Sequence, residues 1–484
     1  MMPTQGGIPG ETDVPLCIDL DGTLIRSDLL WESLFCFARQ RFRQVFSIPL
    51  WFAKGRAHLK RNLAASIVLD LGLLPYNQPF IEWLRVQRAR GRRMILCTAA
   101  DELLARRVAD HVGLFDQVMA SDGNSNLKGR NKARLLAQRF GSDFDYAGNS
   151  AADWHIWLVC RQIIAVDTPG WLTRRLAKSG RLTETFLRAK PPASVWRRAL
   201  RLHQWTKNVL IFVPIIAAHQ ALGPRAIPTL ICFASFCLVA SATYLVNDLF
   251  DLASDRQHPR KRHRPIAAGD LSIPVAVTAC AALFAAGLAL AFLSNTILVP
   301  LLILVYTMAS LAYSFGLKKL ALFDVYLLSG FYTLRIVIGG IAGKVPLSRW
   351  FLSFSVFLFL SLGFAKRSAE LHRLPEGRVP GRGYIASDVQ PVMCFGVAAA
   401  FAAALVLSLY LQSEEVQTLY SHPRLLWMLF PICLYWLTRI WLLASRGTLH
   451  DDPISFAISD RLTWVLIAIC GFILRLAASK MPLG

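Results

Sequence analysis

The sequence is poor in acidic residues and contains no closely spaced pair of cysteines. Asp and Glu number 31 against 53 Lys and Arg, which leaves a formal net charge of +22. None of the ten cysteines forms a Cys-x-x-Cys pair, so neither a disulfide framework nor a zinc site is expected. The first 14 residues are polar and acidic, and they lack the basic start and apolar core of a signal peptide. We therefore expect the N-terminal domain to remain in the cytoplasm.

Apolar residues are distributed unevenly along the 484 residues. Residues 1–190 mix charged and apolar segments as a soluble domain does, whereas long apolar stretches alternate with short polar loops from Val209 onward. The pattern predicts an N-terminal domain over 1–165, a basic linker over 166–204, and an all-α polytopic membrane domain over 205–484. Nine transmembrane helices are expected, at 207–222, 227–246, 272–293, 296–314, 322–342, 350–365, 391–411, 425–444 and 461–478.

Basic residues indicate the side of the membrane on which each loop lies. With a cytoplasmic N-terminus, the loops that fall inside contain most of the Arg and Lys residues between the expected spans, and the loops outside contain few. The pattern therefore predicts a multi-pass protein of the inner (cytoplasmic) membrane. Attraction to anionic lipid is sufficient to explain the basic linker, so we expect a membrane partner and no nucleic acid.

The first candidate site follows a short apolar strand at Leu16–Ile18. The strand leads into Asp-Leu-Asp-Gly-Thr, in which the carboxylates of Asp19 and Asp21 point to the same side. This motif resembles the haloacid dehalogenase superfamily, an α/β Rossmann-like fold with a helical cap, which we expect at about 29–87. The resemblance implies that Asp19 attacks a phosphoryl group and that Asp21 protonates the leaving group. It also implies that both aspartates bind Mg²⁺.

Later segments follow the motif order of that superfamily. A second strand ends in Thr98, which matches the phosphate-binding hydroxyl, and Lys132 matches the charge-neutralising lysine, with Lys128 less favoured. The metal-binding loop contains Asn149 and Asp153. Its usual Gly-Asp is here Gly-Asn, which removes one charge from the metal site, although an amide oxygen can still bind Mg²⁺. An inactive N-terminal domain with a regulatory or binding role therefore stays open.

The expected cap contains an apolar segment with a basic border. Residues 46–52 are Phe-Ser-Ile-Pro-Leu-Trp-Phe, and Arg and Lys residues flank them on both sides. This composition is typical of a patch that lies on a membrane surface. An ordinary cap with an aromatic core is the alternative.

The second candidate site is the acidic segment 247–256 at the end of an apolar span. If the helix continues through it, Asn247, Asp251 and Asp255 are spaced by four residues and Asp248 lies beside them. Oxygen ligands of this kind suit Mg²⁺ together with substrate phosphates. These four residues are therefore predicted to hold Mg²⁺ on a diphosphate. The basic residues that follow are predicted to bind its phosphates: Arg256, Arg260, Lys261 and Arg264.

Nine spans with an acidic motif after the second are similar to the UbiA-type intramembrane prenyltransferases. Within them, five segments resemble the branch of decaprenyl-phosphate phosphoribosyltransferases: 204–208, 247–269, 313–324, 365–371 and 451–457. The resemblance implies that phosphoribosyl diphosphate is the donor and that a polyprenyl phosphate lipid is the acceptor. Further substrate-binding residues are expected in these segments: Lys207, Asn208, Tyr313, Lys318, Lys366 and Arg367.

The resemblance leaves two interpretations of the donor substrate, phosphoribosyl diphosphate and prenyl diphosphate. A second acidic motif is expected where prenyl diphosphate binds, yet the loop after the sixth span offers Lys366, Arg367 and Glu370 without paired aspartates. More bases suit a donor with an extra phosphate group, and the N-terminal domain would then remove the 5-phosphate of the lipid product. The alternative is prenyl transfer from prenyl diphosphate to an aromatic acceptor. Asp324 and Arg335 lie in a largely apolar span, where they either act on substrate or form a structural ion pair.

Overall fold

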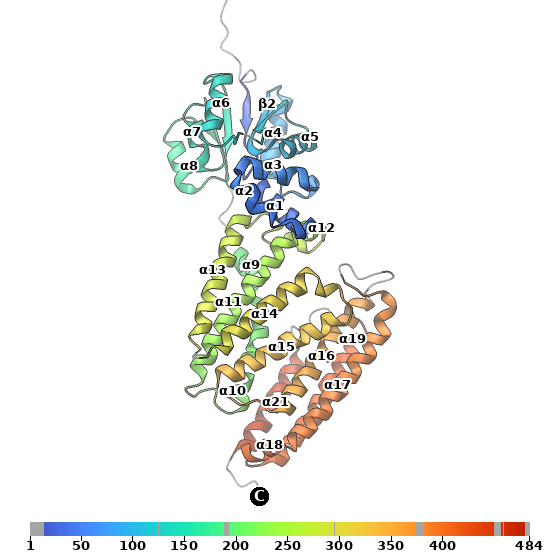
Figure 1. Cartoon of the computed structure of the whole chain (residues 1–484). Coiled ribbons are helices and arrows are strands. Elements are labelled where there is room, and N and C mark those ends of the chain that lie inside the picture. Colours follow the sequence, from blue (N-terminus) through green and yellow to red (C-terminus); the bar gives the residue numbers. More distant parts are fainter. Residues whose placement is uncertain are drawn as a thin grey trace, which may run out of the picture. The chain divides into compact units, whose positions relative to one another are not determined.

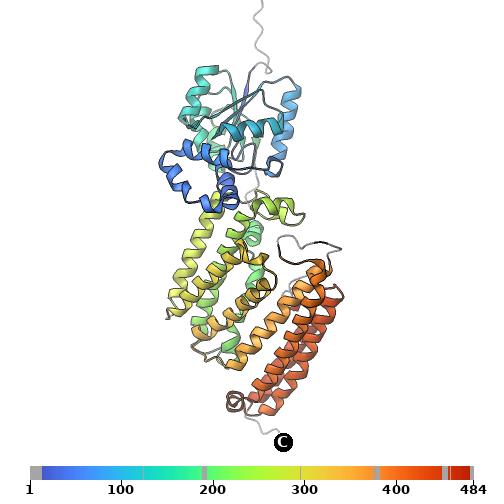
Figure 2. The same ribbon diagram turned by 45° about the vertical axis from the view of Figure 1, so that its right-hand side comes forward.

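The computed structural model describes residues 14–479 except 124, 188–192, 295, 374–376, 378–381, 450–455 and 458. Most of the 451–457 segment therefore lies outside the described residues. The chain, traced in Figures 1 and 2, divides into two compact units. One unit contains Met1–Leu200 and Tyr244–Ala281, and the other contains Arg201–Thr243 and Ala282–Gly484. The acidic segment 247–256 thus belongs to the same unit as the N-terminal domain.

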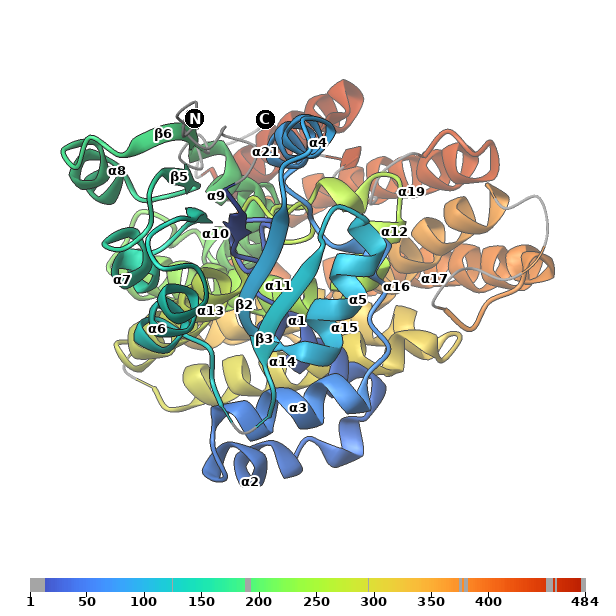
Figure 3. The same ribbon diagram turned by 90° about the horizontal axis from the view of Figure 1, so that it is seen from above.

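The N-terminal domain is built on a parallel sheet of six strands in the order β3-β2-β1-β4-β5-β6 (β2 and β3 are seen side by side in Figure 3). The strand order reverses at β1, which pairs with β2 on one side and β4 on the other. Ligands of such sheets bind beyond the carboxyl ends of the strands at this position. The arrangement confirms the predicted haloacid dehalogenase-like α/β fold. The strands are β1 (Leu16–Ile18), β2 (Met94–Asp101), β3 (Gln117–Ser121), β4 (Asp145–Gly148), β5 (Ile163–Val166) and β6 (Leu182–Phe186).

Helices cover both faces of this sheet. Leu16 and Ile18 of β1 belong to one hydrophobic core and Cys17 to another, because successive side chains of a strand point to opposite faces. The first core includes Phe80 of α4, and the second includes Leu136 of α6. Both cores together fix the strand ends that carry the first candidate site. The helices are α4 (Gln78–Ala89), α5 (Glu102–Val112), α6 (Arg130–Phe140), α7 (Trp154–Trp157) and α8 (Gly170–Ala177).

The expected helical insert is present between β1 and β2 and has a small core of its own. Its first helix begins after Asp28, whose side chain accepts hydrogen bonds from the amides of Leu30 and Trp31. Phe37 of this helix packs against Leu59. The elements are α1 (Leu29–Gln40), the 3₁₀ helix η1 (Phe42–Gln44), α2 (Ser47–Ala53), α3 (Arg56–Ser66) and the 3₁₀ helix η2 (Leu71–Leu73).

The apolar segment of the insert points outward for the most part. Trp51 packs against the small core, but Phe42, Phe46, Leu50 and Phe52 are exposed, Phe46 to 85% and Leu50 to 67%. An aromatic core therefore accounts for Trp51 and not for the other four, which we call the outer patch. Exposed basic residues border it: Arg41, Arg43, Lys54 and Arg56.

Eight helices in the part of the chain that the structure describes have the length and composition of membrane spans. They coincide with the last eight of the nine expected spans. α11 and α13 contribute residues to both compact units. The eight helices are α11 (Ala226–Phe250), α13 (Ile273–Phe292), α14 (Leu298–Phe315), α15 (Phe323–Ala342), α16 (Arg349–His372), α17 (Val389–Leu411), α19 (Leu429–Ser445) and α21 (Arg461–Ala478).

The first expected span, 207–222, does not form a long α-helix, so the expectation of nine transmembrane α-helices is corrected to eight. The segment begins in the 3₁₀ helix η4 (Leu202–Phe212), and a new helix, α10 (Val213–Ala217), starts around Pro214. Proline lacks the amide hydrogen that the interior of a helix needs, so it favours such a restart. Shorter elements elsewhere are α9 (Ala193–Ala199), α12 (Leu252–Gln257), α18 (Glu414–Leu419), η5 (Lys261–His263), η6 (Leu317–Lys319), η7 (Ala386–Asp388) and η8 (Pro423–Met428).

η4 nevertheless lies along two of the long helices. It runs beside α11 in the opposite direction, because the Trp205 indole donates to the Ser241 hydroxyl (3.0 Å) and the Phe212 ring packs on Phe233. It also approaches α15, where a Cβ atom on Gly339 would lie only 2.0 Å from the carbonyl oxygen of Ile211. The glycine permits this close backbone contact.

Candidate active sites

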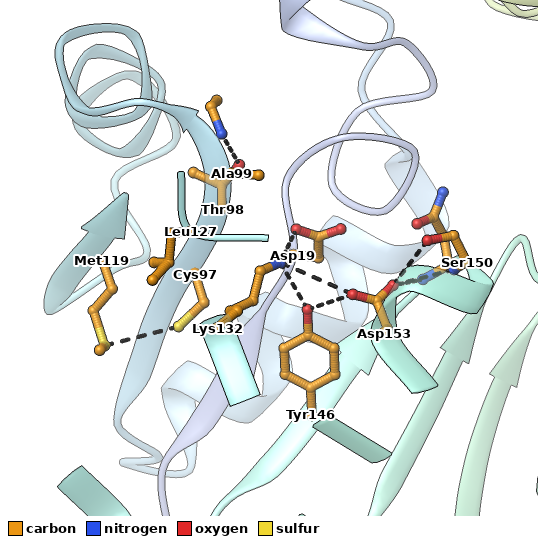
Figure 4. A network of polar contacts seen from close by, with 12 residues as sticks. Asp19, Cys97, Thr98, Ala99, Met119, Leu127, Lys132, Tyr146, Ser150 and Asp153 are labelled. Carbon is orange, nitrogen blue, oxygen red and sulfur yellow. Dashed lines mark hydrogen bonds and ion pairs between the residues drawn. The ribbon is translucent and has the colours of Figure 1, made fainter. Parts of the chain in front are cut away.

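The residues predicted for the N-terminal site meet at the carboxyl end of the sheet. Asp19 follows β1, Thr98 lies in β2, and Lys132 reaches the site from α6. Lys132 Nζ donates to Asp19 Oδ1 (2.7 Å), and both side chains are buried (Figure 4). The Thr98 hydroxyl accepts a hydrogen bond from the Ala100 amide (3.0 Å). A carboxylate and an ammonium group are thus paired at the strand ends, whereas the Thr98 hydroxyl is bonded to the backbone of its own strand.

Burial dominates the electrostatics of this site. It raises the pKa of Asp19 to about 6, although the Lys132 ammonium group acts in the opposite direction. Burial and the nearby Asp28 carboxylate raise the pKa of Asp21 well above its usual range. Asp21 Oδ1 accepts a hydrogen bond from the Leu29 amide (2.8 Å) at the start of α1. A carboxyl group whose protonated form is favoured in this way is suited to protonate a leaving group.

Asp153, which is predicted to bind a metal ion, is engaged by protein groups in this structure. Its Oδ1 accepts a hydrogen bond from the Tyr146 hydroxyl (2.9 Å), and its Oδ2 accepts from the amides of Asn149 and Ser150 (3.2 and 3.1 Å). Tyr146 in turn accepts from Lys132 Nζ (3.0 Å; Figure 4). Asp153 therefore shapes the loop after β4 and positions Lys132 through Tyr146. The sequence offers one indication that Tyr146 belongs to the site, because a tyrosine buried in a strand needs a hydrogen-bond partner for its hydroxyl group.

Asn149 lies against the loop that carries the two aspartates. A Cβ atom on Gly22, where φ is 75°, would lie 1.9 Å from Asn149 Nδ2, so this position requires glycine. Among the residues that the structure describes, no three His, Cys, Asp or Glu side chains are grouped as ligands of one metal ion. A magnesium site here would use Asp19, Asp21 and the Asn149 amide oxygen with waters, a donor set that Mg²⁺ accepts.

The acidic segment places two of its carboxylates on one guanidinium group. Asp248 lies at the end of α11 and Asp255 in α12. Arg264 Nη1 donates to Asp248 Oδ1 (3.0 Å) and to Asp255 Oδ2 (2.7 Å). Burial raises the pKa of Asp255, although Arg264 opposes this shift. The structure thus brings together three of the predicted residues, with the arginine between the two carboxylates.

The α-helix is interrupted within the segment, but the helical spacing persists. α11 ends at Phe250, yet the Asp251 amide donates to the Asn247 carbonyl (2.9 Å) and the Asp255 amide to the Asp251 carbonyl (2.8 Å). Asn247 Oδ1 is buried and has no hydrogen-bond partner within the described part of the chain. A buried oxygen without a partner fits a cation ligand. Two of the predicted phosphate-binding residues near η5 are exposed, Arg260 and Lys261.

Arg256 is held by protein groups and is not open to a substrate. Its guanidinium group donates to both carboxylate oxygens of Glu32 (3.1 and 2.7 Å) and to the Ala267 carbonyl (3.0 Å). The side chains of Arg256 and Glu32 are only 7% and 3% exposed. The predicted phosphate ligand is therefore, in this structure, a link between the acidic segment and α1.

A separate polar cluster in the other unit surrounds Asp324 at the start of α15. Asp324 is buried, and it accepts hydrogen bonds from Arg367 (2.5 Å), Arg382 (3.1 Å) and the Tyr384 hydroxyl (2.7 Å). Arg382 also donates to the Tyr313 hydroxyl (3.2 Å). The predicted residues Tyr313 and Arg367 are thus brought together, whereas Arg382 and Tyr384 carry no signal in the sequence beyond their place in a basic loop.

Comparison with known proteins assigns both parts of the chain. Residues 209–456 match the UbiA prenyltransferase family, and residues 16–156 match the haloacid dehalogenase-like hydrolases. The chain belongs to the UbiA prenyltransferase family. It carries in addition a haloacid dehalogenase-like domain at its N-terminal end. Both families are enzymes, and the apolar helices make this UbiA-family member a multi-pass membrane protein.

Three relatives show how far the similarity extends. An uncharacterised protein of Sinorhizobium fredii is 40% identical over 466 residues, which cover 95% of this chain and 90% of that protein. The nodulation protein NoeC of Azorhizobium caulinodans is 35% identical over 294 residues, or 60% of this chain and 94% of that protein. The decaprenyl-phosphate phosphoribosyltransferase of Mycobacterium tuberculosis is 40% identical over 191 residues, or 38% of this chain and 63% of that protein.

The hydrolase-like site of this UbiA-family protein opens into a cavity of about 750 Å³. One end is polar and contains Asp19, Asp21 and Lys132. Apolar side chains of the helical insert line much of the remainder, so the cavity can hold a phosphate group together with an apolar portion of the same molecule. These apolar residues are Leu29, Leu30, Leu34, Ile48, Phe52, Leu59 and Leu63.

Within the UbiA-type domain, Asn208 and Lys207 lie in η4. Asn208 is buried, accepts a hydrogen bond from Arg335 Nε (2.8 Å) and donates to Cys237 Sγ (3.2 Å). Lys207 Nζ lies 5.9 Å from the centre of the Tyr332 ring. Arg335 is therefore held by Asn208, whereas Asp324 is held by other groups. The remaining predicted residues are Lys318 in η6 and Lys366 in α16.

We expect Tyr146→Phe to lower hydrolysis of p-nitrophenyl phosphate by the full-length protein about tenfold, as for the loss of one charge-assisted hydrogen bond. The change keeps the ring but removes the hydroxyl that links Lys132 to Asp153. Tyr76→Phe is the matched control, because the Tyr76 hydroxyl is buried without a hydrogen-bond partner in the described residues. Equal rates for the two variants would contradict this role of Tyr146.

Proposed function

We propose that the membrane domain transfers 5-phosphoribose from phosphoribosyl diphosphate to a polyprenyl phosphate, and that the N-terminal domain then hydrolyses the 5-phosphate of the lipid product. One observation carries the choice of donor. Asp324 is surrounded by the guanidinium groups of Arg367 and Arg382 and by the Tyr384 hydroxyl, and these donor groups are suited to bind phosphate. The similarity to a decaprenyl-phosphate phosphoribosyltransferase supports the same donor.

The transfer breaks the bond between C1 of the ribose and the diphosphate oxygen, and a phosphate oxygen of the lipid forms a new bond to C1. In our proposal Asn247, Asp248, Asp251 and Asp255 hold Mg²⁺, which when bound stabilises the charge of the departing pyrophosphate. Arg264 bridges two of these carboxylates in the structure. It is therefore placed to contact the diphosphate when the carboxylates take up the metal.

The hydrolysis uses the chain's own carboxyl groups. Asp19 attacks the phosphorus, the bond from phosphorus to the ribose oxygen breaks, and Asp21 gives its proton to that oxygen. Water then cleaves the aspartyl phosphate, which releases inorganic phosphate and restores Asp19. Lys132 compensates the negative charge of the phosphate oxygens next to Asp19. Mg²⁺ would be held by Asp19 and Asn149, and by Asp21 once it has given up its proton.

The outer patch supports a lipid-linked substrate, because it continues into the apolar part of the cavity through Phe52. We expect the double variant Phe46→Ser, Leu50→Ser to lower hydrolysis of a lipid phosphomonoester in nanodiscs at least tenfold, since two large apolar side chains no longer enter the membrane surface (roughly 1.5–3 kcal/mol each). Hydrolysis of soluble p-nitrophenyl phosphate should stay unchanged.

Trp171→Ser is the control for this pair, because Trp171 is an exposed aromatic residue on α8, outside the patch and the cavity. It should affect neither substrate. Equal losses on the lipid and the soluble substrate would show a folding defect, and no loss on either would exclude the patch from substrate capture.

We also propose that η4 and α10 form a ninth membrane crossing. Eleven residues of 3₁₀ helix rise about 22 Å and five of α-helix about 7.5 Å, so the two together approach the roughly 30 Å of a bilayer core. The antiparallel contacts with α11 agree with this. The crossing directs the N-terminal domain and the acidic segment to the cytoplasm, on the side where basic loops gather.

An impermeant maleimide tests this orientation in intact cells. It should label an Ala221→Cys variant more than the wild type, because residue 221 follows the proposed crossing. It should not label a Ser254→Cys variant more than the wild type, because Ser254 lies in the acidic segment. Label on Ser254→Cys above the wild-type level would exclude the proposed topology.

The experiment that tests the transferase is incubation of the purified full-length protein with Mg²⁺, polyprenyl phosphate and radiolabelled phosphoribosyl diphosphate. We expect label in the lipid fraction with the wild type and none with Asp251→Ala. The proposal fails if no label enters the lipid under conditions in which prenyl diphosphate and an aromatic acid react.

A further inference from the structure

α1 of the helical insert touches two sites within one compact unit. Its first residues belong to the hydrolase site, because the Leu29 amide donates to Asp21 and Ser33 lines the cavity. Its later residues contact the acidic segment 247–256, which lies more than 200 positions further along the chain. One helix thus connects the proton donor of the hydrolase site to the carboxylates of the transferase site.

The first contact is a buried ion pair. Glu32 receives two hydrogen bonds from the Arg256 guanidinium group, and the Ser27 hydroxyl donates to the same carboxylate (2.5 Å). Arg256 also reaches the Ala267 carbonyl, so this pair connects both ends of the loop that contains Arg264. A buried charge that loses its partner remains without compensation in an environment of low polarity. Loss of Glu32 is therefore expected to displace the loop.

The second contact comes from Arg39 near the end of α1. Its Nη1 donates to the Phe250 carbonyl (3.0 Å) and the Ser254 hydroxyl (3.3 Å), and it lies 3.5 Å from Asp251 Oδ1. The ring of Phe35 packs edge-on against Phe250 at 5.3 Å. Arg39 therefore holds the turn between α11 and α12, where the acidic residues change from one helix to the next.

A third contact involves Gly269 at the end of the same loop. Its φ is 72°, and a Cβ atom there would lie 3.0 Å from Pro75 Cβ and 3.1 Å from Arg26 Cβ. The loop backbone thus lies directly against the N-terminal domain at this point. Together the three contacts cover the loop before and after Arg264.

We infer that Glu32 and Arg39 are positioning residues for the transferase, so that the N-terminal domain is a structural part of the transferase site independently of its own hydrolysis. Neither residue lines the hydrolase cavity. The inference rests on the proposed function for the reaction that is assayed. It requires that changes at Glu32 or Arg39 impair transfer, and that loss of the hydrolytic nucleophile does not.

The test uses the full-length protein in nanodiscs and compares Glu32→Gln, Arg39→Met and Arg39→Lys with Arg106→Ala, a control at an exposed ion pair on α5. We expect Glu32→Gln and Arg39→Met to lower phosphoribosyl transfer at least tenfold and to raise the Mg²⁺ concentration for half-maximal rate. Arg39→Lys should restore most of the rate, because it returns the positive charge. Hydrolysis of p-nitrophenyl phosphate should match the control in every variant.

Hydrogen–deuterium exchange of residues 247–269 supplies a readout that does not depend on the reaction. Exchange should increase in Glu32→Gln and Arg39→Met and remain unchanged in Arg106→Ala. If Glu32→Gln loses hydrolysis as well, it has failed to fold. The Arg39 variants then decide the inference, because Arg39 is 46% exposed and its change should not disturb folding. Transfer and exchange equal to the control in Arg39→Met would overturn the inference. If the wild type transfers no phosphoribose, the proposed function fails. Hydrogen–deuterium exchange of residues 247–269 then decides by itself whether Glu32 and Arg39 position this segment.

Discussion

Asp19→Asn should abolish the release of phosphate from the lipid product and leave the transfer of phosphoribose unchanged. An amide oxygen is a poor nucleophile, so we expect hydrolysis to fall roughly 10³-fold or more. The side chain keeps its size, and its hydrogen-bond partner is Lys132 of the hydrolase site. The lipid that accumulates should therefore still carry the 5-phosphate.

Lipid chromatography distinguishes the outcomes, because wild-type protein should give the phosphorylated and the dephosphorylated lipid and Asp19→Asn only the first. Asp110→Asn on α5 is the matched control, since Asp110 is exposed and lies outside the cavity. It should behave as the wild type does. Continued phosphate release from the lipid by Asp19→Asn would exclude the N-terminal domain as the lipid phosphatase.

The hydrolase-like site was open to prediction because its signals are local. A short buried strand followed by two aspartates determines both the position and the direction of these side chains, and the sheet of a doubly wound fold places such strand ends together. The contact between Asp153 and Tyr146 was not predicted, because Tyr146 lies in a buried strand and not in a loop motif. Local patterns do not show such side-chain networks.

The other contacts depend on residues that are far apart in the sequence. Glu32 and Arg256 are separated by 224 positions, and Asp324 and Tyr384 by 60, so no periodicity relates them. The expectation of a long α-helix at 207–222 was wrong for a different reason. Hydropathy over 207–222 reports apolar character, but it does not distinguish an α-helix from a 3₁₀ helix that restarts around Pro214.

Asp248→Asn is expected to lower phosphoribosyl transfer about 10²- to 10³-fold, because it removes one charge from the carboxylates that face Arg264. Asp248 is 3% exposed, so its charge acts in a poorly solvated environment and water compensates little of the loss. Asn keeps the size of the side chain and one oxygen, so the fold should persist. Hydrolysis of p-nitrophenyl phosphate, which uses Asp19 and Asp21, should remain at the wild-type rate.

Asp270→Asn separates this effect from a general loss of acidic charge near the loop. Asp270 belongs to the same compact unit, lies 3.8 Å from Arg198 and is 36% exposed, so its change should leave transfer within about twofold of the wild type. A Mg²⁺ titration then decides how Asp248 acts. If Asp248 holds the metal, Asp248→Asn should require more Mg²⁺ for half-maximal rate, whereas an unchanged Mg²⁺ requirement with a lower maximal rate would assign Asp248 to the orientation of Arg264 and not to the metal.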